Sequence, residues 1–223
     1  MTKRVYKFLS AEHAIDNLQR KRLKIALIDG LNDPFDLASI DTTDDRIRDA
    51  LDVLINDIRQ RIGLLCFSRN WDNLLMWSHY AAAHTGACLG FDIPADKNYD
   101  LDVRYQPNLL KIRRHEDVNL DLAGRLLHTK HESWSYEQEV RAFVGLNDPP
   151  DENGRRWKDF DDNLQLREVI IGAQCSPSIS RNIVDATKPY GESVKCYWAG
   201  MRQDAFLLVL LNRTPEWHDS VSA

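Results

Sequence analysis

The sequence changes its apolar period sharply near residue 63. Before that point, apolar side chains follow one helical face over five turns, at Ile47, Leu51, Leu54, Ile58 and Ile62. The next residues, 64–68, form the continuous apolar run of a buried strand. This junction of a long amphipathic helix and a buried strand predicts a fold that contains both helices and sheet.

Other strand-length apolar runs are separated by helical patterns, without a regular βαβ repeat. Strands are expected at 5–9, 23–27, 87–91, 103–105, 134–144, 166–171, 194–198 and 206–211. Ser10 and Ser176 occupy N-cap positions ahead of helical segments. The order predicts an α+β fold with a mixed, mostly antiparallel two-sheet core, similar to a split barrel, and three or four helices.

The chain is 223 residues long, which suits one large domain or two small ones. No change of composition marks a boundary, and the Pro149-Pro150 segment is interpreted as a surface loop. We therefore expect a single domain over residues 1–223, with the last ten or so residues frayed.

Composition and charge argue against several classes of protein. The net charge is −5 and the basic residues are scattered, unlike the basic face of a dedicated nucleic-acid-binding domain. The start of the chain has no apolar signal core, and no apolar run approaches the roughly 20 residues that span a membrane. Four cysteines lie in apolar runs without a C-x-x-C pair, which indicates reduced thiols and a cytoplasmic protein: Cys66, Cys88, Cys175 and Cys196.

The segment 134–143 is the first candidate for chemistry. As a strand, it would place Glu137, Glu139 and Arg141 on one face, and its aromatic side chains on the other. Carboxylates two positions apart on a strand lie roughly 6.5–7 Å from each other, which allows divided roles. The charged face is either the wall of a cleft or a solvated surface, where a Glu–Arg pair contributes under about 1 kcal/mol.

The second candidate is the segment 66–84, where a strand leads into a helix. A helix that starts after a strand is a common place for a ligand pocket, and Tyr80 could stack on a flat ring there. The alternative is that Met76 and Trp77 fill the core and that His79 is a hydrogen-bonded, partly buried histidine. No metal site is predicted, because His79 has no second ligand at suitable spacing.

The third candidate joins the first strand, with Tyr6 and Lys7, to the segment 31–36. Asn32 and Asp33 can bond their own backbone and Pro34 fixes φ, so Asn-Asp-Pro-Phe-Asp forms a rigid turn. It is either a structural loop or the rim of a pocket. The sequence contains no P-loop, no G-x-G-x-x-G and no G-x-S-x-G motif, so these common enzyme classes fit poorly.

Together these motifs resemble a widespread bacterial family known only as a domain of unknown function. The resemblance covers roughly residues 5–175, and its motifs are Tyr6-Lys7, 31–36, 66–68, 76–81, Gly86, 90–92, Lys130, Trp134 and 136–141. The family name implies no reaction.

A more distant likeness is to ADP-ribosyltransferases, which implies an enzyme that consumes NAD. In the order typical of that group, Tyr6 or Lys7 would bind the ribose of NAD, and Phe67 and Tyr80 would flank nicotinamide. Glu139, with Glu137 beside it, would stabilise the positive charge that develops as nicotinamide leaves. The predicted NAD site also includes Ser68, His79 and Arg141. The first-strand His or Arg common in that group is absent here.

Three hypotheses stay open. The first is an NAD-consuming transferase or glycohydrolase, as a toxin or phage-defence effector that modifies a nucleic acid or a protein. The second is a hydrolase or nuclease that uses Glu137, Glu139 and His79 with a divalent metal. The third is a non-catalytic module that binds a ligand or a partner, such as a sensor in a defence or stress system. A small-molecule nucleotide, NAD, is the partner expected under the first hypothesis. Oligomeric state is not predicted.

Overall fold

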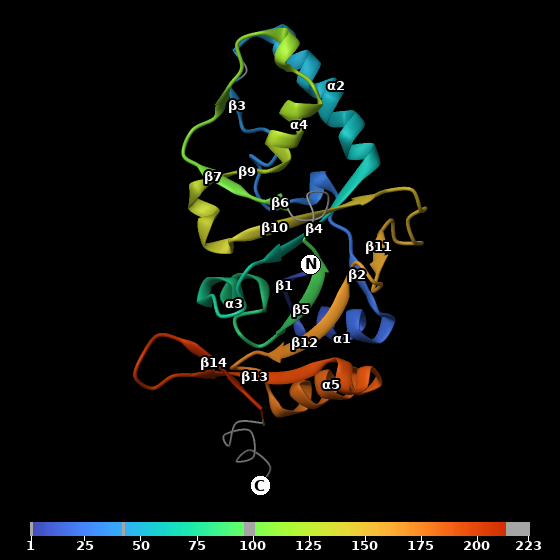
Figure 1. Ribbon diagram of the computed structural model, residues 1–223, viewed down its shortest axis with the longest axis vertical. Helices are drawn as coiled ribbons and strands as arrows, with labels where there is room; N and C mark the ends of the chain where they lie inside the picture. Colours follow the sequence, from blue (N-terminus) through green and yellow to red (C-terminus); the bar gives the residue numbers. More distant parts are fainter. Residues whose placement is uncertain (1, 42, 96–100, 213–223) are drawn as a thin grey trace. The chain divides into compact units, whose positions relative to one another are not determined.

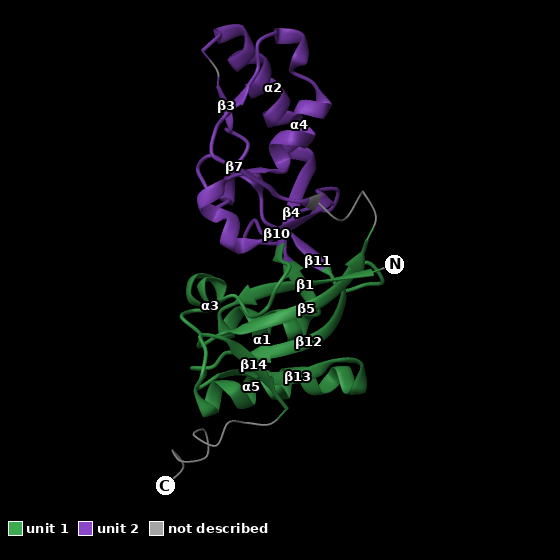
Figure 2. Cartoon of the chain, turned by 60° about the vertical axis from the view of Figure 1, so that its left-hand side comes forward, with its two compact units in different colours: residues 1–23, 67–95, 159–223 green, residues 24–66, 96–158 purple. Residues whose placement is uncertain are grey.

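The computed structural model describes residues 2–41, 43–95 and 101–212. The chain divides into two compact units, coloured separately in Figure 2. Unit 1 comprises residues 1–23, 67–95 and 159–223, and unit 2 comprises residues 24–66 and 96–158. The single domain expected from the sequence stays a prediction. The last ten residues, which were expected to be frayed, lie outside the described residues.

Unit 1 is built on strands in the order β14-β13-β12-β5-β1 (Figure 1). β1 and β5 pair antiparallel along their whole length, from Thr2 opposite Pro94 to Leu9 opposite Ala87. β12 and β13 are parallel, whereas β12–β5 and β13–β14 are antiparallel. The strands are β1 (Thr2–Leu9), β5 (Ala87–Pro94), β12 (Gln165–Ile171), β13 (Lys195–Met201) and β14 (Leu208–Leu211).

Two helices of unit 1, α1 (Ala11–Arg20) and α5 (Pro177–Thr187), pack against each other. The side chains of Ser10 and Ser176 cap their first turns, as predicted. The sequence predicts a helix from about Leu74 to His84, but α3 (Leu74–Tyr80) ends earlier, because the residues from Ala82 to His84 adopt positive φ. A short 3-10 helix, η4 (Lys188–Ser193), follows α5.

Unit 2 has its own apolar core around α2 (Asp45–Arg61) and α4 (Leu120–Leu127). The apolar face that the sequence predicts for α2 is buried in this core through Ile47, Leu51 and Ile58. Asn119 caps α4 by accepting from two backbone N–H groups. Short 3-10 helices η1 (Ile28–Gly30) and η2 (His115–Asp117) complete the helical part.

The remaining strands lie wholly or partly in unit 2. β4 (Ile62–Ser68), β10 (Glu139–Gly145) and β6 (Leu101–Asp102) follow one another in the strand order. The last two residues of β4 belong to unit 1, where Ser68 lies opposite Tyr6 of β1. Two parallel pairs are β7 (Arg104–Gln106) with β9 (Thr129–His131), and β3 (Ile40–Asp41) with β8 (Leu110–Lys111). β2 (Arg22–Lys24) pairs with β11 (Trp157–Asp159).

The α+β class with mostly antiparallel strands is confirmed. The strands of the described ranges form no closed barrel, and these ranges contain five α-helices, of which α3 and α4 have seven and eight residues. No helix within the same ranges is both long and apolar enough to cross a membrane.

Candidate active or ligand-binding site

The Asn-Asp-Pro-Phe-Asp segment of unit 2 folds into the rigid turn that its residues predict. Asp33 Oδ1 accepts the Phe35 N–H at 2.9 Å, and the Asp36 N–H donates to the Asp33 carbonyl at 3.1 Å. Ser39 Oγ donates to the Phe35 carbonyl at 2.9 Å and closes the loop. These bonds fix the two aspartates relative to each other, so their carboxyl groups have defined positions.

The segment 134–144 is not one strand, which corrects the sequence prediction. Residues Glu132–Glu137 form a 3-10 helix, η3, and β10 begins only at Glu139. Between them Gln138 adopts the left-handed conformation at φ 44° and ψ 50°. The two-residue alternation that placed Glu137 and Glu139 on one strand face therefore does not apply to Glu137. Both carboxylates nevertheless reach the same cation, because the left-handed residue redirects the chain between them.

That cation is Lys130, on β9. Its Nζ lies 2.5 Å from Glu137 Oε2 and 3.2 Å from Glu139 Oε2. Tyr105 of the adjacent β7 lies opposite Lys130 in the strand register, and its hydroxyl accepts the Glu139 N–H at 2.8 Å. The parallel β7–β9 pair thus holds Lys130 and the start of β10 in one place (Figure 1).

Arg141 completes a buried ion network. Its Nε and one terminal nitrogen lie 2.9 and 3.0 Å from the two oxygens of Glu139. The same terminal nitrogen is 2.8 Å from Asp36 Oδ1, and the other donates to the Leu127 carbonyl at 3.0 Å. We call Asp36, Lys130, Glu137, Glu139 and Arg141 the buried ion network. Its members all belong to unit 2.

The network is buried. It is therefore not the solvated strand face that was one of the two alternatives for Glu137, Glu139 and Arg141 in the sequence analysis. The side chains of Lys130, Glu139 and Arg141 are 2%, 5% and 0% exposed. Buried charges are stable only when paired and hydrogen-bonded, and removing one member of a buried pair is far more costly than removing an exposed one. The Glu–Arg pair is therefore part of the interior of unit 2.

The charges set the protonation states of the network. Burial alone would raise the pKa of Glu139, but Arg141 and Lys130 outweigh it and lower that pKa to about 2. Burial alone would lower the pKa of Lys130, but Glu139 and Glu137 outweigh it and raise that pKa. Burial raises the pKa of Asp36 in spite of the opposing effect of Arg141.

These states limit the chemistry. A carboxylate that stays ionised down to about pH 2 and is held by two cations is neither a proton donor nor a strong base near neutral pH. Lys130, kept charged by two carboxylates, has no free electron pair for nucleophilic attack. The network is suited to holding the surrounding backbone and side chains in a fixed arrangement.

A pocket of about 590 Å³ adjoins the network in unit 2. Lys130 belongs to both, and the pocket's other walls come from the 33–39 loop, the 106–109 segment and β9 with the start of η3. Phe35 and Leu109 are 56% and 45% exposed there. Trp134 is held in place by Lys130, whose Nζ lies 4.9 Å from its ring centroid. The volume is in the range of pockets that take drug-sized or nucleotide-sized ligands.

Two buried polar atoms in the pocket wall have no hydrogen-bond partner in the protein. They are Asp33 Oδ2, an acceptor, and Gln106 Nε2, a donor. Native proteins leave few buried polar atoms unpartnered, so these two atoms are exceptions among the residues that line the pocket.

Comparison with known proteins bears on this part of the chain. The model of a family described as "Protein of unknown function (DUF2971)" matches residues 76–142. No protein of curated function and no solved structure matches the chain.

The DUF2971 match confirms the resemblance to a domain of unknown function over these residues, and it covers Lys130, Glu137, Glu139 and Arg141. The loop 33–39, which completes the pocket, lies before the matched residues, as do Tyr6 and Lys7. The likeness to ADP-ribosyltransferases stays a prediction.

The other residues of the predicted NAD site lie in unit 1. The Tyr6 hydroxyl donates to Glu168 at 3.2 Å, and Ser68 is 1% exposed. Phe67 is 3% exposed, with its ring centroid 6.0 Å from that of Phe91. Their roles toward NAD stay predictions, as does that of Lys7, which is partly buried on β1.

The α3 region also supplies two predicted site residues. His79 is exposed, and its ring centroid lies 6.3 Å from that of Tyr80, which is partly buried. Met76 and Trp77 are 8% and 0% exposed, so the interpretation of both as core residues is confirmed.

Sequence reasoning missed several charged residues with structural partners. Asp36 and Lys130 were noted only as parts of motifs, because nothing local links them to Glu139 or Arg141. In unit 1, Glu168 is 8% exposed, receives hydrogen bonds from Arg4 and Tyr6, and lies over Gly90. The glycine in the mostly apolar β5 was the one available signal, since a Cβ there would lie 2.4 Å from the Glu168 Cγ.

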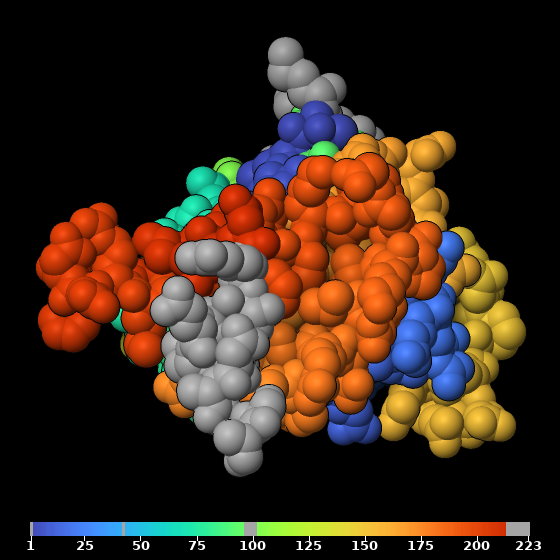
Figure 3. All heavy atoms as spheres, turned by 90° about the horizontal axis from the view of Figure 1, so that it is seen from below, coloured from blue at the N-terminus to red at the C-terminus, as the bar shows by residue number. Residues whose placement is uncertain are grey.

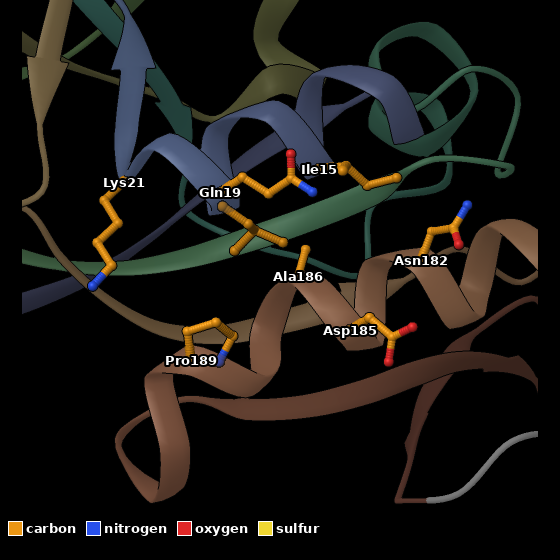
Figure 4. A pocket seen from close by; sticks show the side chains of 8 residues that line it. Ile15, Gln19, Lys21, Asn182, Asp185, Ala186 and Pro189 are labelled. Atoms are coloured by element: carbon orange, nitrogen blue, oxygen red, sulfur yellow. The ribbon is translucent and has the colours of Figure 1, made fainter.

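A second hollow, of about 480 Å³, lies between α1 and α5 in unit 1 (Figure 4). Figure 3 shows the face of the molecule that carries α5, whose atoms are orange. The polar side chains around the hollow are exposed and can be solvated; they are Gln19, Lys21, Asn182 and Asp185. None of the buried unpartnered atoms of the described residues lines it. It is a groove between packed helices, and the pocket of unit 2 is the better candidate site.

The described residues contain no group of three or more His, Cys, Asp or Glu side chains that could hold a metal ion. The four cysteines are free thiols.

Proposed function

We propose that the pocket of unit 2 binds a small molecule with a planar ring, of the nucleotide class, and that the chain acts as a ligand-binding module. The observation that carries this proposal is a pocket of about 590 Å³ with an exposed aromatic side chain at its edge and a buried ion network beside it.

The aromatic residues support a planar ligand. Phe35 exposes 56% of its surface although the bonds of its loop fix its backbone. Covering an aromatic ring by another ring removes apolar surface from water and adds a stacking contribution of about 0.5–1.5 kcal/mol. Trp134, ordered by the cation Lys130, offers a second ring surface in the same pocket.

The ion network supports binding because it makes the pocket rigid before the ligand arrives. A ligand loses less free energy to ordering when the groups that contact it are already fixed. Asp36 and Lys130 tie the loop 33–39 and β9, two of the pocket's walls, to the same guanidinium–carboxylate cluster.

NAD is the ligand that the motif order suggests, and binding would be the first step of an NAD-consuming reaction. We retain that reaction as a proposal, with a nucleic acid or a protein as acceptor and a role as a toxin or phage-defence effector. Its support is the likeness in motif order. Free thiols at all four cysteines support a place in the cytoplasm.

The test is calorimetric titration of the purified chain with NAD, nicotinamide, adenosine and cytidine. We expect at least one of these to bind, and Phe35→Ala to weaken that binding about tenfold through loss of the stacked ring. Phe206→Ala is the matched control, because Phe206 is 96% exposed and lies in unit 1.

No binding by any of the four compounds, or equal binding by wild type and Phe35→Ala, would contradict the proposal. Nicotinamide release, followed in the same samples, tests the NAD-consuming reaction separately. Release by the wild type supports an enzyme, and binding without release supports a module that only binds.

A further inference from the structure

Asp33 and Gln106 give the pocket wall a specific hydrogen-bonding pattern. Asp33 is 4% exposed, and its two carboxylate oxygens have different surroundings. Oδ1 accepts the Phe35 N–H at 2.9 Å, whereas Oδ2 is buried without a partner in the protein. Asp33 and Gln106 are both among the residues that line the pocket. Two residues of the pocket lining, from different walls, thus carry an acceptor and a donor that have no partner in the protein.

These atoms are unusual within the molecule. Four buried side-chain atoms of the described residues lack a partner, and two of the four are these pocket atoms. A third, Asp36 Oδ2, belongs to the buried ion network three residues from Asp33. A buried polar atom without a partner destabilises the fold, and a ligand that supplies the partner recovers that loss on binding.

We propose that Asp33 Oδ2 and Gln106 Nε2 recognise a donor–acceptor edge on the planar ligand. This inference rests on the proposed function and names the ligand class: a ring that carries an amino or carboxamide group next to an acceptor. The carboxamide of nicotinamide and the amino edges of adenine and cytosine have this pattern. Asp33 accepts from the ligand N–H, and Gln106 donates to the ligand's ring nitrogen or carbonyl.

The charges near the pocket also favour a ligand edge without negative charge. Asp33 and the buried ion network together hold four carboxylates and two cations, Lys130 and Arg141. An anionic group placed in the pocket beside Asp33 would meet an excess of negative charge. The recognised edge is therefore neutral or cationic, and a nucleotide would keep its phosphates out of contact with Asp33.

The test compares ligands that differ only at this edge. The pairs are nicotinamide with nicotinate, adenosine with inosine, and cytidine with uridine, each titrated into the full chain. In each pair that binds, we expect the first member to bind at least about tenfold more tightly, because the second member has an acceptor oxygen where the first has its N–H₂ donor, which leaves Asp33 without its hydrogen bond.

Two substitutions reverse the pattern with little change of shape. Asp33→Asn keeps an oxygen for the Phe35 N–H and places an N–H₂ donor where the acceptor was. Gln106→Glu converts the donor into an acceptor. We expect each to reduce the preference within a pair about tenfold, and Phe206→Ala, a change at an exposed residue of unit 1 outside the pocket, to leave it unchanged.

The outcomes separate the two proposals. If the wild type binds none of the compounds, the proposed function fails. If it binds them but treats both members of each pair alike, the proposed function holds and this inference is overturned. The wild-type comparison decides the matter even where a substituted chain does not fold.

Discussion

Glu139 is the residue on which structural and catalytic roles are easiest to confuse. Its carboxylate joins Arg141 to Lys130 in the interior of unit 2. A loss of activity in Glu139→Gln would therefore say little by itself, because the same change removes a buried charge on which two cations depend. Stability has to be measured beside activity.

We expect Glu139→Gln to lower the free energy of unfolding by about 3–5 kcal/mol, since it leaves buried cations without their main partner. Urea denaturation measures this change. Asp16→Asn is the matched control, because the Asp16–Arg20 pair, at 2.7 Å, has side chains 38% and 61% exposed and should contribute under about 1 kcal/mol. Wild-type stability in Glu139→Gln, with activity lost, would instead favour a catalytic glutamate.

The stability conferred by Glu139 should also depend on pH. Its folded-state pKa, lowered to about 2 from an ordinary 4.5, means that its contribution is complete above pH 4.5 and is lost as the pH falls towards 2. The pKa of Asp36 is raised by burial, so its effect on the pH dependence of stability has the opposite sign. Comparing wild type with Glu139→Gln at each pH isolates the contribution of Glu139, because Asp36 is present in both proteins.

Denaturation at a series of pH values should show a stability difference between these two proteins that is constant above about pH 5 and shrinks below pH 4.5. A difference that stays constant down to pH 3 would mean that the pKa of Glu139 is not lowered.

At the scale of the elements, the turn at Gln138 decides how the network forms. A left-handed conformation is unfavourable for residues with a Cβ by about 1–2 kcal/mol, and more so for β-branched residues. Its position between η3 and β10 brings Glu137 and Glu139 to the same lysine.

We expect Gln138→Val to destabilise the protein by at least about 1 kcal/mol more than Gln138→Gly, because only glycine takes this conformation freely. Both variants lose the glutamine side chain, so the comparison isolates the backbone. Thermal or urea unfolding measures it, and equal stability of the two would show that the left-handed turn is absent in solution.

Gly90 offers a test in unit 1. Gly90→Ala places a Cβ 2.4 Å from the Glu168 Cγ, so the glutamate and its bonds to Arg4 and Tyr6 must shift, at a cost of about 1–3 kcal/mol. Gly124→Ala is the control: it lies in α4, nothing lies within 4 Å of its added Cβ, and alanine favours a helix. Equal effects of the two changes would contradict the packing of Glu168 over Gly90.

The local elements could be predicted from the sequence wherever one periodic signal dominated. The five-turn apolar face gave the helix at Ile47–Ile58, and Ser10 and Ser176 fixed two helix starts. The segment 134–138 was misassigned because alternating residues suit a strand, and no residue type there announces a left-handed turn at a glutamine. The helix α3 was predicted but its early end was not, since no residue type announces the positive φ of Ala82, Ala83 and His84.

At the scale of the whole molecule, the site depends on contacts between distant parts of the chain. Asp36 and Arg141 are 105 positions apart in sequence, yet their side chains bond at 2.8 Å. The motif residues could be found without a structure, whereas their partners and burial could not, because no local pattern links the loop 33–39 to β9 and β10. The pocket and the network lie together in unit 2, and most of the other predicted site residues belong to unit 1.

Hydrogen–deuterium exchange of the full chain, with and without the compound that binds most tightly, tests the location of the site most directly. We predict slower exchange in residues 33–39, 106–109 and 129–134, which form the walls of the pocket in unit 2. Protection confined to residues 4–9 and 67–80 of unit 1, around Tyr6 and Tyr80, would contradict this account and favour the NAD site that the motif order suggests.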